Sequence, residues 1–153
     1  MRRVLLIVVI IGLMFLAYRL YENRSGPEAR YKNFAEAILH RQYDAAAAMT
    51  DGLPSSDLQR SGTQEKIGAG PQMFQTLFPS RFDIQTRETA PNGTLTLHAV
   101  QTVLFNPPGV ESAVRPAMYA TMNQTVSLRK SGDAWKITAF ENKLARMDSL
   151  SSR

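Results

Sequence analysis

The chain has 153 residues, which is enough for one domain of ordinary size with its own hydrophobic core. It contains no cysteine, so disulfides and thiolate metal ligands are excluded and packing must hold the core together. The net charge of +5 does not indicate nucleic-acid binding. Residues 1–24 hold four arginines and one glutamate, which accounts for +3 of the net charge, and no run of basic residues follows in the rest of the chain.

The first 24 residues have the composition of a membrane anchor. An apolar segment of about 18 residues follows two arginines, and roughly 17 to 25 such residues span a bilayer as a helix. Tyrosine and arginine near its end suit the membrane interface. We therefore predict a retained anchor that includes Val4, Phe15, Tyr18, Arg19 and Tyr21. A cleaved signal peptide is the alternative, but a small-x-small cleavage site is missing from the end of the apolar segment.

The short basic head before the apolar segment favours a cytoplasmic N-terminus, although basic residues lie on both sides of that segment. The rest of the chain would then be periplasmic or extracellular. We predict a single-pass protein of a bacterial cytoplasmic membrane, with the lipid bilayer as one partner. The expected organisation is an anchor with its flanks over residues 1–24, an α+β domain over 25–142 and a polar tail over 143–153.

Helical periodicity dominates the start of the predicted domain. Ser25 and Glu28 have the spacing of a capping box, and apolar residues then recur at intervals of three and four. They are Tyr31, Phe34, Ala35, Ile38, Leu39, Ala45, Ala46 and Met49. This stripe predicts two helical pieces or one bent helix. Residues 52–70 are polar and predict a loop with at most a weak helix over 57–66. Residues 71–78 predict a short helix that starts at a proline.

From Arg81 onward the apolar period changes to two, which is typical of half-buried strands. Strands are predicted over residues 82–85, 95–105, 117–129 and 134–140, with turns at Asn92-Gly93 and at Gly132. After Asn142, a single helical turn covered by Leu144 and Met147 is one prediction and disorder is the other.

The last predicted strand pair carries Gly132, Trp135 and Ile137 near its turn. Together with the order of helices followed by strands, it resembles the nuclear-transport-factor-2-like superfamily, also called cystatin-like or SnoaL-like, over residues 30–142. The resemblance implies an α+β cone in which two to three helices pack on a curved antiparallel sheet of about four strands. Members include ketosteroid-isomerase-like enzymes, dehydratases, small-ligand binders and membrane-tethered assembly modules, so fold alone does not name the function.

Gln101 and Gln124 are the polar residues on the strand faces that should point inward. Isomerase chemistry needs a carboxylate base beside a hydrogen-bond donor, and an amide cannot exchange a proton near neutral pH. We therefore predict no catalytic residue, no metal site and no cofactor. The two amides either orient a ligand or satisfy each other's hydrogen bonds. The pocket in the first case would be lined by Gln101, Gln124, Met118, Met122 and Trp135.

The opposite strand face is polar and suits lateral docking, although a solvated surface explains it equally well. The predicted protein interface consists of Tyr119, Thr121, Asn123, Thr125 and Arg129. Tethering beside a bilayer raises the effective concentration toward other membrane components. Our leading hypothesis is a membrane-anchored, non-catalytic binding module, an accessory or assembly subunit of a larger membrane complex. The alternative is a small-molecule binder or an isomerase- or dehydratase-like enzyme that uses the cone pocket.

Overall fold

The computed structural model describes residues 13–14, 25–68, 75–76, 78–106 and 117–150. In these residues helices come first and an antiparallel sheet follows, which confirms the predicted α+β class. Among the described residues, no helix is long and apolar enough to cross a membrane. The residues predicted to form the anchor, Val4, Phe15, Tyr18, Arg19 and Tyr21, lie outside the described ranges.

The first long helix, α2 (Pro27–Leu39), begins without the predicted capping box. Gly26 is the N-cap residue, and no side chain makes a capping hydrogen bond there. Pro27 occupies the first turn, where the fixed φ of proline suits a helix and its missing N–H is not needed. The helix therefore starts through backbone geometry rather than through Ser25 and Glu28.

The apolar stripe predicted either two helical pieces or one bent helix, and two helical pieces form. Helix α2 is followed by α3 (Tyr43–Ala48), and between them Arg41 adopts a left-handed φ of 58°. The loop predicted for residues 52–70 is wrong for most of its described part, because α4 (Ser55–Arg60) and α5 (Thr63–Ile67) form there, over much of the range 57–66 where a weak helix was allowed. Helices of six and five residues complete fewer than two turns, so their periodicity is invisible in the sequence.

In the described part of the chain the sheet has five antiparallel strands: β1 (Gln75–Thr76), β2 (Arg81–Thr89), β3 (Leu95–Asn106), β4 (Met118–Ser131) and β5 (Ala134–Ser149). Strands β1 and β2 pair with the same edge of β3, and β4 and β5 follow on its other side. The four long strands form where strands were predicted, although β2 and β5 extend beyond the predicted ranges. Strand β1 replaces part of the helix predicted over 71–78, of which residues 71–74 and 77 lie outside the described ranges.

Strand β5 continues past Asn142, so the helical turn or disorder predicted after that residue is wrong for residues 143–149. Leu144 lies opposite Met122 and Arg146 opposite Thr121, which leaves Ala145 as the extra residue of a β-bulge. The extra residue resets the alternation of side chains. It places Leu144 and Met147 on one face of a strand at a spacing of three, which imitates a helix in the sequence.

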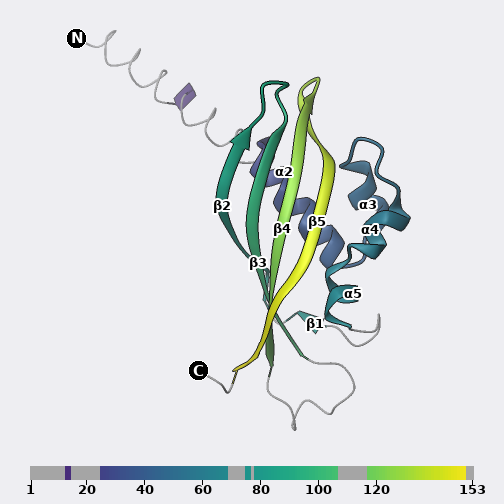
Figure 1. Cartoon of the computed structure of the whole chain (residues 1–153), viewed down its shortest axis with the longest axis vertical. Helices are drawn as coiled ribbons and strands as arrows, with labels where there is room; N and C mark the ends of the chain where they lie inside the picture. The colour runs from purple at the N-terminus through teal and green to yellow at the C-terminus, as the bar shows by residue number, and fades with distance from the viewer. Residues whose placement is uncertain (1–12, 15–24, 69–74, 77, 107–116, 151–153) are drawn as a thin grey trace, which may run out of the picture.

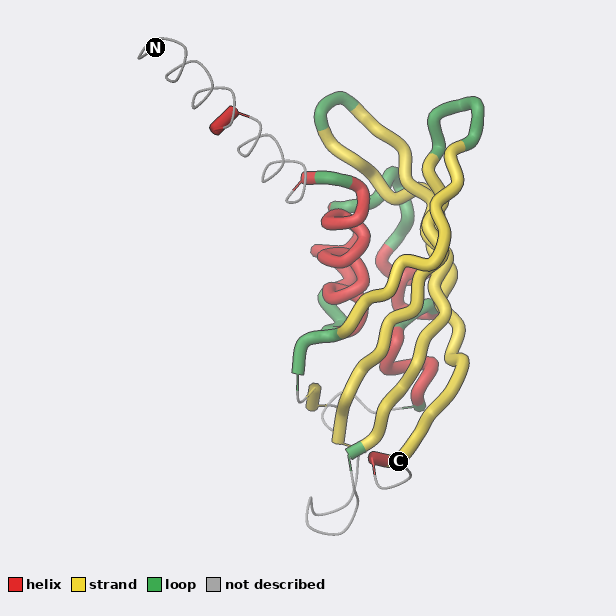
Figure 2. The backbone as a smooth tube through the Cα atoms, turned by 90° about the vertical axis from the view of Figure 1, so that its left-hand side faces the viewer, coloured by secondary structure: helices red, strands yellow, loops and turns green. Residues whose placement is uncertain are grey.

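The core lies between α2 and one face of the sheet, and Figure 2 shows the helices gathered against that face. Phe34 of α2 is fully buried and meets Phe140 of β5 edge to face, with ring centroids 4.9 Å apart. Along β3 every second residue is buried, as the period of two predicted. Below the helices the sheet extends further, and the lower half of β5 runs down this extension to the C-terminus (Figure 1). The two faces of the sheet therefore meet different surroundings.

Candidate functional site

The two glutamines predicted to face inward do lie in the core, and they bond to each other. Gln101 is fully buried and Gln124 is 2% exposed. The Nε2 atom of Gln124 donates a hydrogen bond to Oε1 of Gln101 at 2.7 Å. The sequence left two alternatives: the amides orient a ligand, or they satisfy each other's hydrogen bonds. The geometry supports the second alternative.

Gln124 is the centre of a wider buried network. Its Oε1 accepts a hydrogen bond from the Tyr31 hydroxyl of α2 at 2.6 Å, and its Nε2 also donates to Oδ1 of Asn142 on β5 at 3.1 Å. Burial raises the pKa of Tyr31 well above its usual value, so this hydroxyl is a neutral donor at neutral pH. Both donor and acceptor atoms of the Gln124 amide thus have partners inside the protein.

Asn142 connects this network to the short helices. Its Nδ2 donates to the backbone oxygen of Ser61 at 3.0 Å and to Oγ1 of Thr63 at 3.1 Å. Sequence reasoning missed Asn142 and Tyr31 as network members. Tyr31 was recognised only as part of an apolar stripe. Period-two counting from the buried Ile137 places Asn142 on the outer face, because the register shift beside Ile137 reverses the alternation before Asn142.

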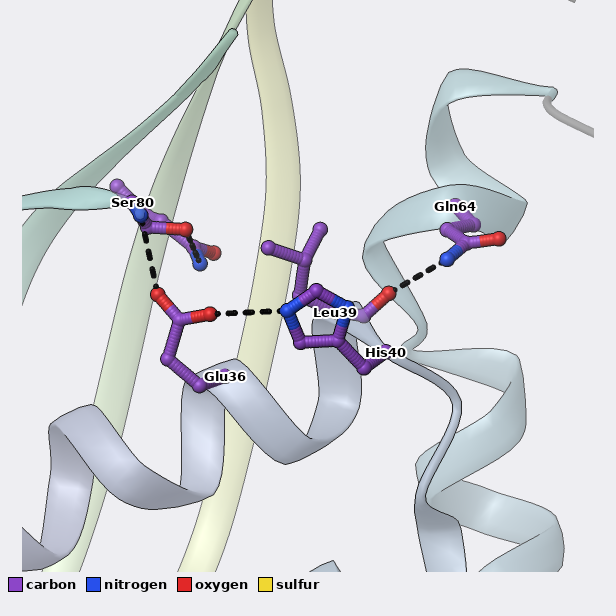
Figure 3. A network of polar contacts seen from close by, with 6 residues as sticks. Glu36, Leu39, His40, Gln64 and Ser80 are labelled. Carbon is purple, nitrogen blue, oxygen red and sulfur yellow. Dashed lines mark hydrogen bonds and ion pairs between the residues drawn. The ribbon is translucent and has the colours of Figure 1, made fainter. Parts of the chain in front are cut away.

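On its other side the network reaches α2 through Ser80, as Figure 3 shows. The Oγ atom of Ser80 accepts from Nε2 of Gln101 at 3.0 Å, and its backbone N–H donates to Glu36 at 3.2 Å. Glu36 in turn meets the exposed His40, with 3.4 Å between Oε2 and Nε2. Nearby, Gln64 of α5 donates to the backbone oxygen of Leu39 at 2.7 Å. The polar groups between helices and sheet therefore hold one another in place.

The structure does not bring the five predicted pocket residues to one place. Met122 lies directly opposite Gln101, and both adjoin Gln124. Met118 is paired with Ser149 at one end of the β4–β5 hairpin, whereas Trp135 is paired with Lys130 near its turn. Twelve residues of β4 separate these two pairs, or about 40 Å at roughly 3.3 Å per residue. Met118 and Trp135 cannot be walls of the same small cavity.

A groove of about 510 Å³ lies on the opposite, outer face of the sheet. Val100, Thr102 and Leu104 of β3 line it together with Tyr119 and Thr121 of β4. Tyr119 and Thr121 belong to the interface predicted from the sequence. The groove is open to solvent and combines apolar side chains with hydroxyl groups, which is the chemistry of a contact surface rather than of an enclosed reaction site.

Charged residues border this groove on both sides. The register aligns Arg81 of β2, Thr102, Thr121 and Arg146 of β5 in one row across the sheet, with an arginine at each end. An aspartate follows two residues after each arginine, and both aspartates also line the groove. On β5 the pair is closed, with 2.6 Å between Nε of Arg146 and Oδ2 of Asp148. The groove therefore presents charges of both signs around a largely neutral floor.

The other predicted interface residues share the outer face of β4 but lie outside the groove. Asn123 is exposed, and the hydroxyl of Thr125 lies 3.2 Å from Nδ1 of His98 on β3. Arg129 donates to Oδ2 of Asp51 at 2.7 Å, so it serves partly to hold the start of the α3–α4 connection. Of the five residues in the predicted interface, two therefore line the groove and three lie on β4 beyond it.

A second polar cluster joins α3 and α5. The Tyr43 hydroxyl donates to Oε2 of Glu65 at 2.8 Å, and Arg41 meets Oε1 of the same carboxylate at 3.0 Å. Burial, together with the carboxylate of Glu65, raises the pKa of Tyr43 above its usual value. A Cβ atom at Gly62 would lie 1.9 Å from Oε2 of Glu65, so a larger residue would disrupt the cluster. Its contacts are those of a structural clamp.

Within the ranges that the structure describes, no three histidine, aspartate or glutamate side chains are close enough together to hold a metal ion. Comparison with known proteins finds no family whose pattern matches the chain and no curated protein that is similar to it.

Proposed function

We propose that this chain is a membrane-anchored, non-catalytic binding module, an accessory or assembly subunit of a membrane complex, which docks a protein partner in the outer groove. In this proposal residues 1–24 form the anchor and the rest is a nuclear-transport-factor-2-like cone on the periplasmic or extracellular side of a bacterial cytoplasmic membrane. One observation carries the proposal. Tyr31, Gln124 and Gln101 bond to one another inside the fold, whereas the groove on the outer face is open to solvent.

The inner network argues against the enzyme alternative. A substrate inside the fold would need a partner for its polar atoms, but the amide of Gln124 already bonds to three side chains. Displacing such buried hydrogen bonds costs about 1 to 3 kcal/mol for each group that is left unpaired. Gln101 adds no acid or base, because an amide does not titrate near neutral pH. The interior is therefore better suited to fixing the fold than to turning over a substrate.

The outer groove supports a protein partner by its chemistry. Tyr119 and Leu104 provide contact area, and Thr102 and Thr121 provide hydroxyl groups that lose little on desolvation. Tyrosine is among the residues that dominate binding energy at protein interfaces. Each border of the groove carries one arginine and one aspartate. They would suit a partner segment that is neutral in the middle and charged, with both signs, on either side. Another subunit at the same membrane surface can present such a segment.

Site-specific photo-cross-linking in cells tests this proposal. A photoreactive phenylalanine analogue replaces Tyr119 in the full chain, since its shape is close to tyrosine, and adducts are identified after irradiation and purification in mild detergent. We expect an adduct with a different membrane-complex subunit. The matched control places the analogue at Ser127, which lies on the same face of β4 but outside the groove.

A second variant, Thr121→Arg, adds a bulky charge to the groove floor. We expect it to abolish co-purification of the cross-linked partner, while Ser127→Arg leaves co-purification unchanged. Two results would refute the proposal. One is equal adduct formation from positions 119 and 127. The other is a full chain that purifies without any partner, so that Thr121→Arg changes nothing.

A further inference from the structure

Strand β5 lies at one edge of the sheet. Among the described residues, another segment pairs only with its upper half, around Ile137, and not with its lower half, residues 143–149. In the upper half, Ile137 forms a parallel bridge with Thr50: its N–H donates to the Met49 oxygen at 3.1 Å and its oxygen accepts from the Asp51 N–H at 2.8 Å. Among the described residues, no backbone group outside β4 bonds to residues 143–148. An uncovered edge of this kind is a template for strand addition.

The hydrogen-bonding direction of this lower edge follows from one bond. The N–H of Leu150 donates to the oxygen of Ala117 at 2.9 Å, so Leu150 points its backbone groups toward β4. Along an antiparallel strand the direction alternates from residue to residue. Met147, three residues earlier, therefore points its N–H and C=O away from β4, into the open edge. Its side chain is 43% exposed, which is high for a methionine on the core-facing side of a sheet.

We propose that the lower half of β5 pairs antiparallel with the same segment of a second copy of this chain, with Met147 opposite Met147 on the two-fold axis. In this register the two Met147 residues exchange N–H···O=C bonds, because both point outward. The sheets of the two copies then join into one. The exposed methionines cover each other.

Charge complementarity selects a second copy as the occupant. With Met147 on the axis, Arg146 of one copy lies directly opposite Asp148 of the other, and the same contact recurs on the other side of the axis. Both side chains lie on the outer face, where Arg146 is 63% and Asp148 33% exposed. Opposite charges at directly facing positions stabilise an antiparallel pair, and like charges destabilise it. The segment is therefore self-complementary in this register.

Charge variants of the full chain in mild detergent test the pairing by light scattering during size-exclusion chromatography. Arg146→Asp places Asp opposite Asp148 twice, and Asp148→Arg places Arg opposite Arg146 twice. We expect each variant alone to raise the dimer dissociation constant at least about tenfold. A mixture of the two variants should restore the dimer, because every facing pair is then of opposite sign. A change confined to folding within one copy would not be rescued by mixing.

Cross-linking through an introduced cysteine provides a second test, and the absence of natural cysteines removes background. Met147→Cys should be cross-linked between copies by a short reagent with two thiol-reactive groups, since facing Cβ atoms lie about 4.5 to 5.5 Å apart. Ala139→Cys, also exposed and on β5 but eight residues from the proposed axis, is the control and should not be cross-linked. A monomeric wild-type chain, a dimer insensitive to both charge variants, or equal cross-linking at both positions would overturn the proposal.

Discussion

Asn123 and Gln124 are adjacent amides on β4, yet they lie in opposite surroundings. Gln124 is buried and makes hydrogen bonds with Tyr31, Gln101 and Asn142, whereas Asn123 is exposed on the outer face. The same functional group thus fixes the core on one face and remains at the surface on the other. Strand alternation, rather than residue type, decides which amide is structural.

The largest expected difference between the faces is for phenylalanine. Phe34→Ala should lower the free energy of unfolding by about 4 kcal/mol, because it leaves a cavity against Phe140. Phe78→Ala, at a residue before β2 that lines the outer groove and is 66% exposed, should change it by no more than about 0.5 kcal/mol. Urea unfolding of the full chain in mild detergent, followed by fluorescence of the single tryptophan, measures both. Equal losses would show that the faces are not distinct.

The adjacent amides give the sharpest version of the comparison. Gln124→Leu should cost about 3 kcal/mol, since it leaves the Tyr31 hydroxyl and two buried amide oxygens without their partner. Asn123→Leu makes a similar change one residue away and should cost less than about 0.5 kcal/mol. The same urea experiment measures both variants. Stabilisation by Gln124→Leu would contradict the assignment of this network to the fold.

Ionisation of Tyr31 should make stability depend on pH in the alkaline range. Its pKa is raised in the folded protein, so the hydroxyl stays protonated after an unfolded chain has begun to lose its proton near pH 10. The folded state then binds more protons, and stability falls as pH rises above about 10. Tyr31→Phe should cost about 1 to 2 kcal/mol at pH 7 and show a shallower alkaline loss. An unchanged slope between pH 9 and about 11 would speak against this role.

The smallest effect is expected on the outer face. Arg129→Ala breaks an ion pair with Asp51 in which both side chains are about half exposed. Such pairs contribute roughly 0.2 to 1 kcal/mol, and salt screens them. We expect a loss near the lower value at physiological ionic strength, disappearing in concentrated salt. A salt-independent loss above about 1 kcal/mol would mean that Arg129 has a role beyond this pair.

The period of two in the sequence predicted the four long strands and the faces of β4 correctly, because alternation is a local property. The bulge at Ala145 is not local: it depends on how β5 is paired with β4, and it hid the second half of β5 behind a helical spacing. Tyr31 and Asn142 were missed as network members for a related reason. Nothing near either residue in the sequence indicates that both will meet Gln124.

The groove also escaped prediction as a unit, although two of its residues were named. Its lining comes from β2, β3, β4 and β5 and from the segment before β2, and only the register brings these together. The charges at its borders, such as Arg81 and Arg146, looked like ordinary solvated residues in the sequence. Their alignment in one row depends on the pairing of all four strands.

The hydrogen bond between Tyr31 and Gln124 joins residues that are 93 positions apart in the chain. By contrast, the β4–β5 hairpin closes through Gly132, whose φ of 61° suits the tight turn, and needs only local contacts. Contacts between distant residues carry the larger loop-closure entropy and slow folding. We therefore expect the hairpin to form early and the amide network to form last, so that substitutions at Gln124 accelerate unfolding while leaving the folding rate almost unchanged.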